Sequence, residues 1–179
     1  LFQFDITLLQ GMQALADALT PQDLEAMVAH MGEYAPRPCF LPFLAELERA
    51  GLPFVLVSGG LVPLVEAVLG PHRHRLDQLV AAEVLPHLGG GLRFASPFAN
   101  GQELVAKAEV VKRYGRGRSV VIGDSITDLG MAEVADLVFA REPLSGWLEQ
   151  RGIAFHPWDS FADVEVVLRQ QGLLPGAAA

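Results

Sequence analysis

The chain has 179 residues, of which 51% are hydrophobic, and it carries a formal net charge of −8. This length and apolar fraction suit one globular domain with a substantial core and room for one small appendage. The acidic balance argues against a nucleic-acid partner, because such binding depends on Lys and Arg neutralising phosphates. The apolar runs fall far short of the about 20 residues that span a bilayer, which argues against a membrane protein. Cys39 is the only cysteine, which predicts a cytoplasmic, reducing environment and disfavours structural zinc.

Short apolar runs alternate with longer amphipathic segments along the chain. This alternation is typical of βα units that build a parallel sheet. The predicted strands are residues 1–4, 53–57, 119–122, 137–140 and 153–155. The predicted helices are residues 42–50, 61–69, 103–113, 126–134, 144–150 and 160–169, several of them followed by a terminating glycine. We therefore predict a doubly wound α/β core with a mostly parallel sheet.

Two segments interrupt this alternation. Thr20 and Pro21 suit the N-cap and first residue of a helix, so we expect a small helical cap inserted after the first strand. Residues 79–86 and 92–98 flank three consecutive glycines, which predicts an antiparallel hairpin hanging off the sheet. The expected division is a core of residues 1–7 and 42–172, a cap of residues 8–41 and a frayed tail of residues 173–179.

The most informative motif lies where the strand at 119–122 ends. Gly123 allows a sharp turn, Asp124 follows it, and Asp128 comes four positions later. If a helix begins near Ser125, its first turn brings the two carboxylates together, a spacing suited to Mg²⁺. The motif taken alone is equally compatible with a capped turn whose acidic residues are favoured by the helix dipole.

Two further signals point to the binding of an anion. Ser58, Gly59 and Gly60 follow the strand at 53–57, and a hydroxyl with unobstructed backbone amides at a helix start can hold a phosphate. Such glycines also occur in ordinary turns. Lys107 precedes Asp124 by 17 positions (124 − 107), and a lysine on a helix is more often a solvent-facing charge than a ligand.

The amino terminus adds a fourth element, because Asp5 and Thr7 follow the first predicted strand. Together, the four elements resemble the haloacid dehalogenase superfamily, in which Asp-x-Asp-x-Thr is followed by Ser or Thr after a strand, a Lys, and Gly-Asp-x-x-x-Asp. The stretches FVLVSGG, KAEVVKRYG and VVIGDSITDLGMAEVADLVFARE resemble its phosphoserine-phosphatase branch, and within that branch the phosphatases of methionine salvage. The resemblance covers nearly the whole chain and implies a Mg²⁺-dependent hydrolase of a small phosphorylated metabolite, with oligomerisation left open.

The resemblance also implies roles for individual residues. Asp5 would act as general acid and base and bind Mg²⁺ through its backbone carbonyl. Lys107 would hold the phosphoryl oxygens together with Ser58, Gly59 and Gly60. Asp124 would bind Mg²⁺ directly, and Asp128 would assist directly or through water.

One position departs from the family pattern. Gln3 stands where the nucleophilic aspartate is expected, and an amide is a poor nucleophile that also removes a negative metal ligand. Three interpretations follow: an altered form of an active phosphatase, a pseudo-enzyme that binds a phosphorylated ligand without turnover, or a structural module. The joint presence of Ser58 and Lys107 favours a site that is still in use.

Overall fold

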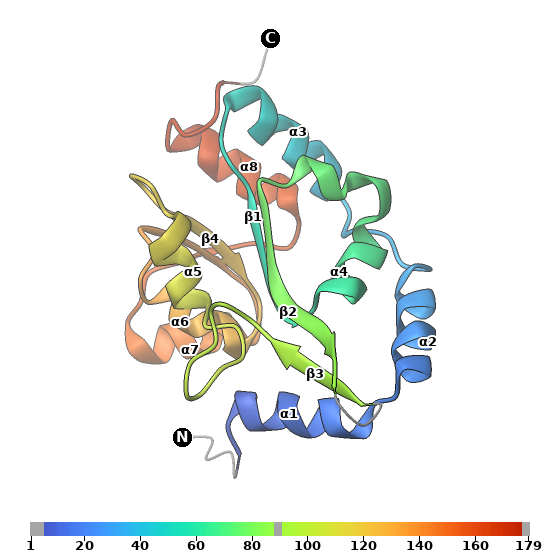
Figure 1. Cartoon of the computed structure of the whole chain (residues 1–179). Coiled ribbons are helices and arrows are strands. Elements are labelled where there is room, and N and C mark those ends of the chain that lie inside the picture. The colour runs from blue at the N-terminus through green and yellow to red at the C-terminus, as the bar shows by residue number, and fades with distance from the viewer. Residues whose placement is uncertain (1–5, 88–90, 177–179) are drawn as a thin grey trace.

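The computed structural model describes residues 6–87 and 91–176 (Figure 1). Its helices are α1 (Leu8–Ala18), α2 (Pro21–Met31), α3 (Phe40–Ala50), α4 (Val62–Leu69), α5 (Lys107–Tyr114), α6 (Leu129–Ala132), α7 (Leu144–Arg151) and α8 (Phe161–Gln170), with short 3₁₀ helices η1 (Gly70–Arg75) and η2 (Ile126–Asp128). Its strands are β1 (Val55–Leu61), β2 (Gln78–Pro86), β3 (Leu92–Ala95), β4 (Val120–Gly123), β5 (Leu137–Ala140) and β6 (His156–Pro157). The predicted α/β class is confirmed. The predicted strand at residues 1–4 lies outside the described residues.

The strands form two groups. β1 pairs in parallel with β2, and β2 pairs antiparallel with β3. β4, β5 and β6 are all parallel, in that order. Because the strands within β4–β6 run in one direction, the residues that follow β4 and β5 lie at the same carboxyl edge.

The hairpin prediction is confirmed in its pairing and wrong in its placement. β2 and β3 are antiparallel, with Glu83 opposite Ala95 and Pro86 opposite Leu92. The first half of β2, however, pairs in parallel with β1, so β1, α4 and β2 form a βαβ unit. The buried residues of β2 (Val80, Ala81 and Ala82) explain why this strand belongs to the core sheet.

Other element boundaries shifted where tertiary packing outweighs local pattern. α5 begins at Lys107 rather than at residue 103, because Leu104, Val105 and Ala106 are buried as an irregular segment. The helix predicted over 126–134 is divided into η2 and α6. The last strand is His156–Pro157, just after the predicted 153–155.

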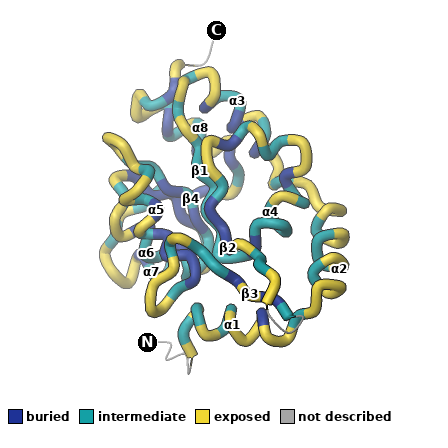
Figure 2. The backbone as a smooth tube through the Cα atoms, viewed as in Figure 1, coloured by how far each residue is buried: buried dark blue, intermediate teal, exposed yellow. Residues whose placement is uncertain are grey.

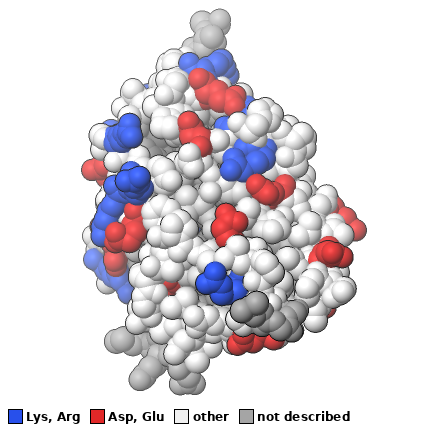
Figure 3. All heavy atoms as spheres, in the orientation of Figure 1, with Lys and Arg blue, Asp and Glu red and all other residues white. Residues whose placement is uncertain are grey.

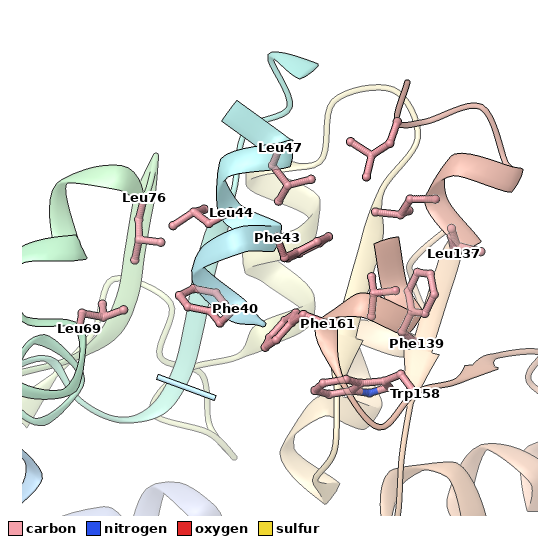
Figure 4. Close-up of a cluster of buried hydrophobic side chains, with 13 residues drawn as sticks. Phe40, Phe43, Leu44, Leu47, Leu69, Leu76, Leu137, Phe139, Trp158 and Phe161 are labelled. Atoms are coloured by element: carbon pink, nitrogen blue, oxygen red, sulfur yellow. The ribbon is translucent and has the colours of Figure 1, made fainter. Parts of the chain in front are cut away.

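One hydrophobic cluster joins both groups of strands (Figure 4). It lies against α3 and α8, where Phe43 and Phe161 stack with ring centroids 5.3 Å apart. Phe139 of β5 is fully buried in it. Burial follows the strands and the inner faces of α3 and α8 in Figure 2, whereas α2 has no buried residue.

The chain stays packed beyond the predicted start of the tail. Leu174 is only 3% exposed and belongs to the same cluster. The amides of Leu173 and Leu174 both donate to the Leu168 carbonyl, at 2.9 and 3.3 Å. A frayed tail from residue 173 is therefore wrong for these two leucines, whose apolar side chains gain more from burial than their ordering costs.

Within the described residues, no helix is long and apolar enough to cross a membrane. On the face shown in Figure 3, basic and acidic side chains are interspersed among uncharged ones. Neither sign of charge covers that face continuously.

Candidate active site

Gly123 ends β4 and brings the following turn close to the strand. A Cβ atom at this position would stand 2.7 Å from the Asp128 Cβ and 2.9 Å from its Oδ2. Only glycine permits that approach. The Gly123 carbonyl accepts a hydrogen bond from the buried Trp158 Nε1 at 3.2 Å, which holds the end of the strand in place.

The Asp128 carboxylate organises the turn after β4. Its Oδ2 accepts hydrogen bonds from the backbone amides of Asp124 and Ser125 at 2.9 and 3.0 Å. Its Oδ1 accepts from the Lys107 ammonium. These donors occupy both oxygens, so Asp128 acts in this arrangement as the group that fixes the turn and the lysine.

Lys107 and Asp128 form a buried ion pair. Their side chains are 8% and 7% exposed, so Lys107 is not the solvent-facing charge that a helical lysine usually is. Burial of a charge is tolerated only when it is paired and hydrogen-bonded. Glu103 lies at the edge of this arrangement, where burial raises the pKa of its carboxyl and the charge of Lys107 opposes that rise.

Asp124 presents the outward-facing carboxylate of the motif. Its side chain is 35% exposed, and its Oδ2 accepts from an Arg37 guanidinium nitrogen at 2.8 Å. Arg141, which follows β5, lies 3.9 Å from the same oxygen, and its guanidinium stands 5.5 Å from the Trp158 ring centroid. Two arginines from distant parts of the chain therefore converge on one carboxylate.

Ser58, Gly59 and Gly60 continue β1 instead of leaving it as a turn. The Ser58 hydroxyl accepts from the Gly60 amide at 3.1 Å. The pairing register of β1 with β2 shifts between Val57 and Leu61, and such irregularities are common beside active sites. A Cβ on Gly59 would meet no described residue within 4 Å, so the described part of the chain leaves space in front of this backbone.

The structure brings together some of the predicted site residues and not others. Lys107, Asp124 and Asp128 are joined by the hydrogen bonds given above. Ser58 and the two glycines lie on β1, against which α5 packs, but no hydrogen bond between described residues links them to those three. Gln3 and Asp5 lie outside the described residues.

The oxygen donors of this site suit a hard cation only in part. Asp124 offers a carboxylate of the kind that Mg²⁺ prefers. Its Oδ2 is engaged by Arg37, and both oxygens of Asp128 already accept hydrogen bonds. Across residues 6–87 and 91–176, no group of three His, Cys, Asp or Glu residues could hold a metal ion.

Sequence reasoning missed Arg37, Arg141 and Trp158. Arg141 could have been found, because it follows the predicted strand 137–140 and must share an edge with Asp124 if the two strands are parallel neighbours. Arg37 carries no such signal, since it precedes a helix and lies 87 positions from its partner.

Comparisons with known proteins identify the family of this chain. A family model described as haloacid dehalogenase-like hydrolase matches residues 2–133. The 2-hydroxy-3-keto-5-methylthiopentenyl-1-phosphate phosphatase of Microcystis aeruginosa is 34% identical over 165 residues, covering 91% of this chain and 78% of that protein. The bifunctional enzyme MtnB/MtnX of Bacillus licheniformis is 30% identical over 177 residues, covering 93% of this chain and 40% of that protein.

Solved structures support the fold. A phosphoserine phosphatase from T. onnurineus, crystallised in complex with NDSB-201, superposes with a TM-score of 0.64 at 21% identity, covering 90% of this chain and 72% of that chain. At that identity the likeness concerns the fold alone. The resemblance inferred from the motifs is confirmed: the chain belongs to the haloacid dehalogenase-like hydrolase family, and the relatives named here place it among the phosphatases of that family.

Proposed function

We propose that this chain is built to bind Mg²⁺ and a small phosphomonoester, and that its site is that of a phosphatase. The observation that carries the proposal is the buried ammonium of Lys107, fixed by Asp128 beside the outward-facing Asp124. A buried cation next to a carboxylate at a strand end suits a phosphoryl group, whose charge the lysine offsets. The Microcystis relative is a 2-hydroxy-3-keto-5-methylthiopentenyl-1-phosphate phosphatase, which supports a small phosphomonoester of that kind as the substrate class.

The roles proposed for the individual residues follow from their positions. Lys107 would neutralise the phosphoryl oxygens as charge develops, and Asp128 would keep its ammonium in place. Asp124 would hold Mg²⁺ together with Asp5, and the bound cation would offset repulsion between phosphate and carboxylates. Ser58 and the Gly59 amide, with open space before them, would hold the remaining oxygens.

The nucleophile position decides whether this exact sequence turns its ligand over. Gln3 cannot form the aspartyl-phosphate expected of the family, since its amide is a poor nucleophile. The same site could therefore serve a non-catalytic protein that binds a phosphorylated ligand, and Gln3 is the observation that favours this second candidate. The joint presence of Ser58, Lys107 and Asp124 favours a site that is still in use over a purely structural module.

The cap and the setting of the protein are part of the proposal. α1 lies along β3 and α2 against α4 (Figure 1), which supports treating residues 8–41 as a reduced helical cap over the core of residues 1–7 and 42–172. We propose a cytoplasmic protein on the evidence of its single cysteine.

Two measurements test the function. The parent, Gln3→Asp and Gln3→Asn are assayed with Mg²⁺ and p-nitrophenyl phosphate; we expect turnover only in Gln3→Asp, because only that variant restores a carboxylate nucleophile. A folded Gln3→Asp protein as inert as the parent would refute the proposed catalytic mechanism.

Calorimetry with Mg²⁺ and inorganic phosphate then tests binding. Affinity that is lost in Asp124→Ala supports a retained site, and no affinity in the parent leaves only a structural role.

A further inference from the structure

Arg37 occupies an unusual place between the cap and the site. It lies in the short connection from α2 to α3, and its guanidinium donates to the Asp124 Oδ2 at 2.8 Å. Its side chain is still 52% exposed, although it is paired with Asp124. Its charge is therefore available to a ligand that arrives there.

The backbone around Arg37 is held rigidly. Pro36 and Pro38 flank it, and proline fixes its own φ while restricting the residue before it to extended backbone. The Arg37 carbonyl accepts from the Phe40 amide at 3.1 Å. Phe40 is 5% exposed and packs against Phe161, with ring centroids 5.2 Å apart. The arginine thus projects from a fixed frame, which lowers the entropic cost of placing its charge.

The present contact of Arg37 competes with the proposed use of Asp124. A guanidinium and a divalent cation at the same carboxylate repel each other, because both are positively charged. A cation on Asp124 therefore favours the release of Arg37. The guanidinium is planar and presents several donors in a fork that matches phosphate oxygens, so a phosphoryl group in front of β4 is the natural new partner.

We infer that Arg37 is a substrate-binding residue that exchanges Asp124 for a phosphoryl oxygen when the site is loaded. This rests on the proposed function and adds to it a ligand contact contributed by the connection between cap and core. Arg141 differs in that its guanidinium lies over the Trp158 ring and stands farther from Asp124. Arg141 can therefore stay near Asp124 when the cation binds.

The experiment measures two affinities by calorimetry in Arg37→Gln, Arg37→Lys and the parent. Loss of the competing charge should tighten binding of Mg²⁺ alone by about 3- to 10-fold in Arg37→Gln. With Mg²⁺ saturating, inorganic phosphate should bind about 10- to 100-fold more weakly in Arg37→Gln, the range for a charge-assisted hydrogen bond. Arg37→Lys should fall between the two, because it keeps the charge without the fork.

The matched control is Arg49→Gln. Arg49 is another arginine paired with a carboxylate, Glu46, and its side chain is 68% exposed near the far end of α3. It should leave both affinities unchanged. Phosphate affinity in Arg37→Gln within twofold of the parent, or Mg²⁺ affinity that is not tightened, overturns the inference while the proposed function stands. A parent that binds neither probe overturns both. Equal urea midpoints of the two glutamine variants show that the fold is retained.

Discussion

Replacing Lys107 with Met should destabilise the protein strongly, although it changes only one charge. Methionine keeps a flexible apolar stem of similar length, so the packing around α5 changes little. What disappears is the ammonium that faces Asp128, both side chains being less than 10% exposed. The carboxylate of Asp128 is then a buried charge without its counter-ion.

The magnitude follows from what remains on Asp128. Breaking a buried ion pair by removing one partner costs about 3–5 kcal/mol. The amides of Asp124 and Ser125 still donate to Oδ2, and because these bonds stabilise the remaining charge we expect the lower end, about 3 kcal/mol. That is a loss of more than about 100-fold in the folding equilibrium constant.

The assay is urea unfolding at neutral pH, with Lys112→Met as the control. Lys112 lies on the same helix and pairs with Glu109 at 2.7 Å, but both side chains are more than half exposed. An exposed pair contributes at most about 0.5 kcal/mol. A loss of unfolding free energy below about 1 kcal/mol in Lys107→Met would refute the reasoning.

Adding Asp128→Asn to Lys107→Met should recover part of the lost unfolding free energy, because the buried negative charge is gone. A double variant that is no more stable than Lys107→Met would show that the destabilisation comes from packing.

Three further predictions concern the turn, the α3 start and pH. Gly123→Ala should cost about 1–3 kcal/mol in urea unfolding, because its Cβ would collide with Asp128; no loss would contradict the close approach. Cys39→Gly should stabilise by up to about 1 kcal/mol, since Cys39 has a φ of 64° that favours glycine, and a destabilised variant would refute strain there. Hydrogen bonds from the Ser119 amide and hydroxyl lower the pKa of Asp136. That carboxylate therefore stabilises the fold above its unfolded pKa and stops doing so as pH falls through the folded one. Asp136→Ala should accordingly lose most stability near pH 7 and progressively less as the pH falls through the folded pKa, and a pH-independent loss would contradict this.

The fold class could be predicted because local signals and global topology agree. β5 was predicted with its observed bounds, since Leu137–Ala140 is an apolar run buried at every position. The predicted placement of β2 was wrong because its local pattern does not reveal its pairing with β1. It begins with exposed Gln78 and ends in a hairpin, so the sequence pattern did not indicate that its first half pairs in parallel with β1. Which strand neighbours which depends on contacts distant in sequence, and periodicity does not record them.

The site was predictable in its composition and only partly in its arrangement. The spacing of Asp124 and Asp128 predicted two neighbouring carboxylates, whereas the structure joins the Asp128 carboxylate to the backbone amide of Asp124 and leaves the Asp124 carboxylate to Arg37. It could not say what each carboxylate does. That depends on Lys107, whose ammonium reaches Asp128 from another helix, and on the backbone amides that the turn exposes. The metal role predicted for Asp128 stays a prediction, and its occupied oxygens favour an indirect one.

The electrostatics of the site explain why these charges need one another. Among the described residues, Lys107 and Arg37 each donate to one of the two carboxylates, so the acidic pair is already compensated in the absence of a ligand. The buried cation cannot leave, because Asp128 would be left uncompensated away from water. Arg37 can move away from Asp124, because its side chain is half exposed and water screens the separated charges. A site that keeps one cation fixed and releases the other can admit a divalent ion at Asp124 without losing its fold, and the freed guanidinium then supplies positive charge where an incoming phosphate requires it. For this reason Lys107→Met should lose folding stability as well as phosphate affinity, whereas Arg37→Gln should change the ligand affinities and leave the folding stability unchanged.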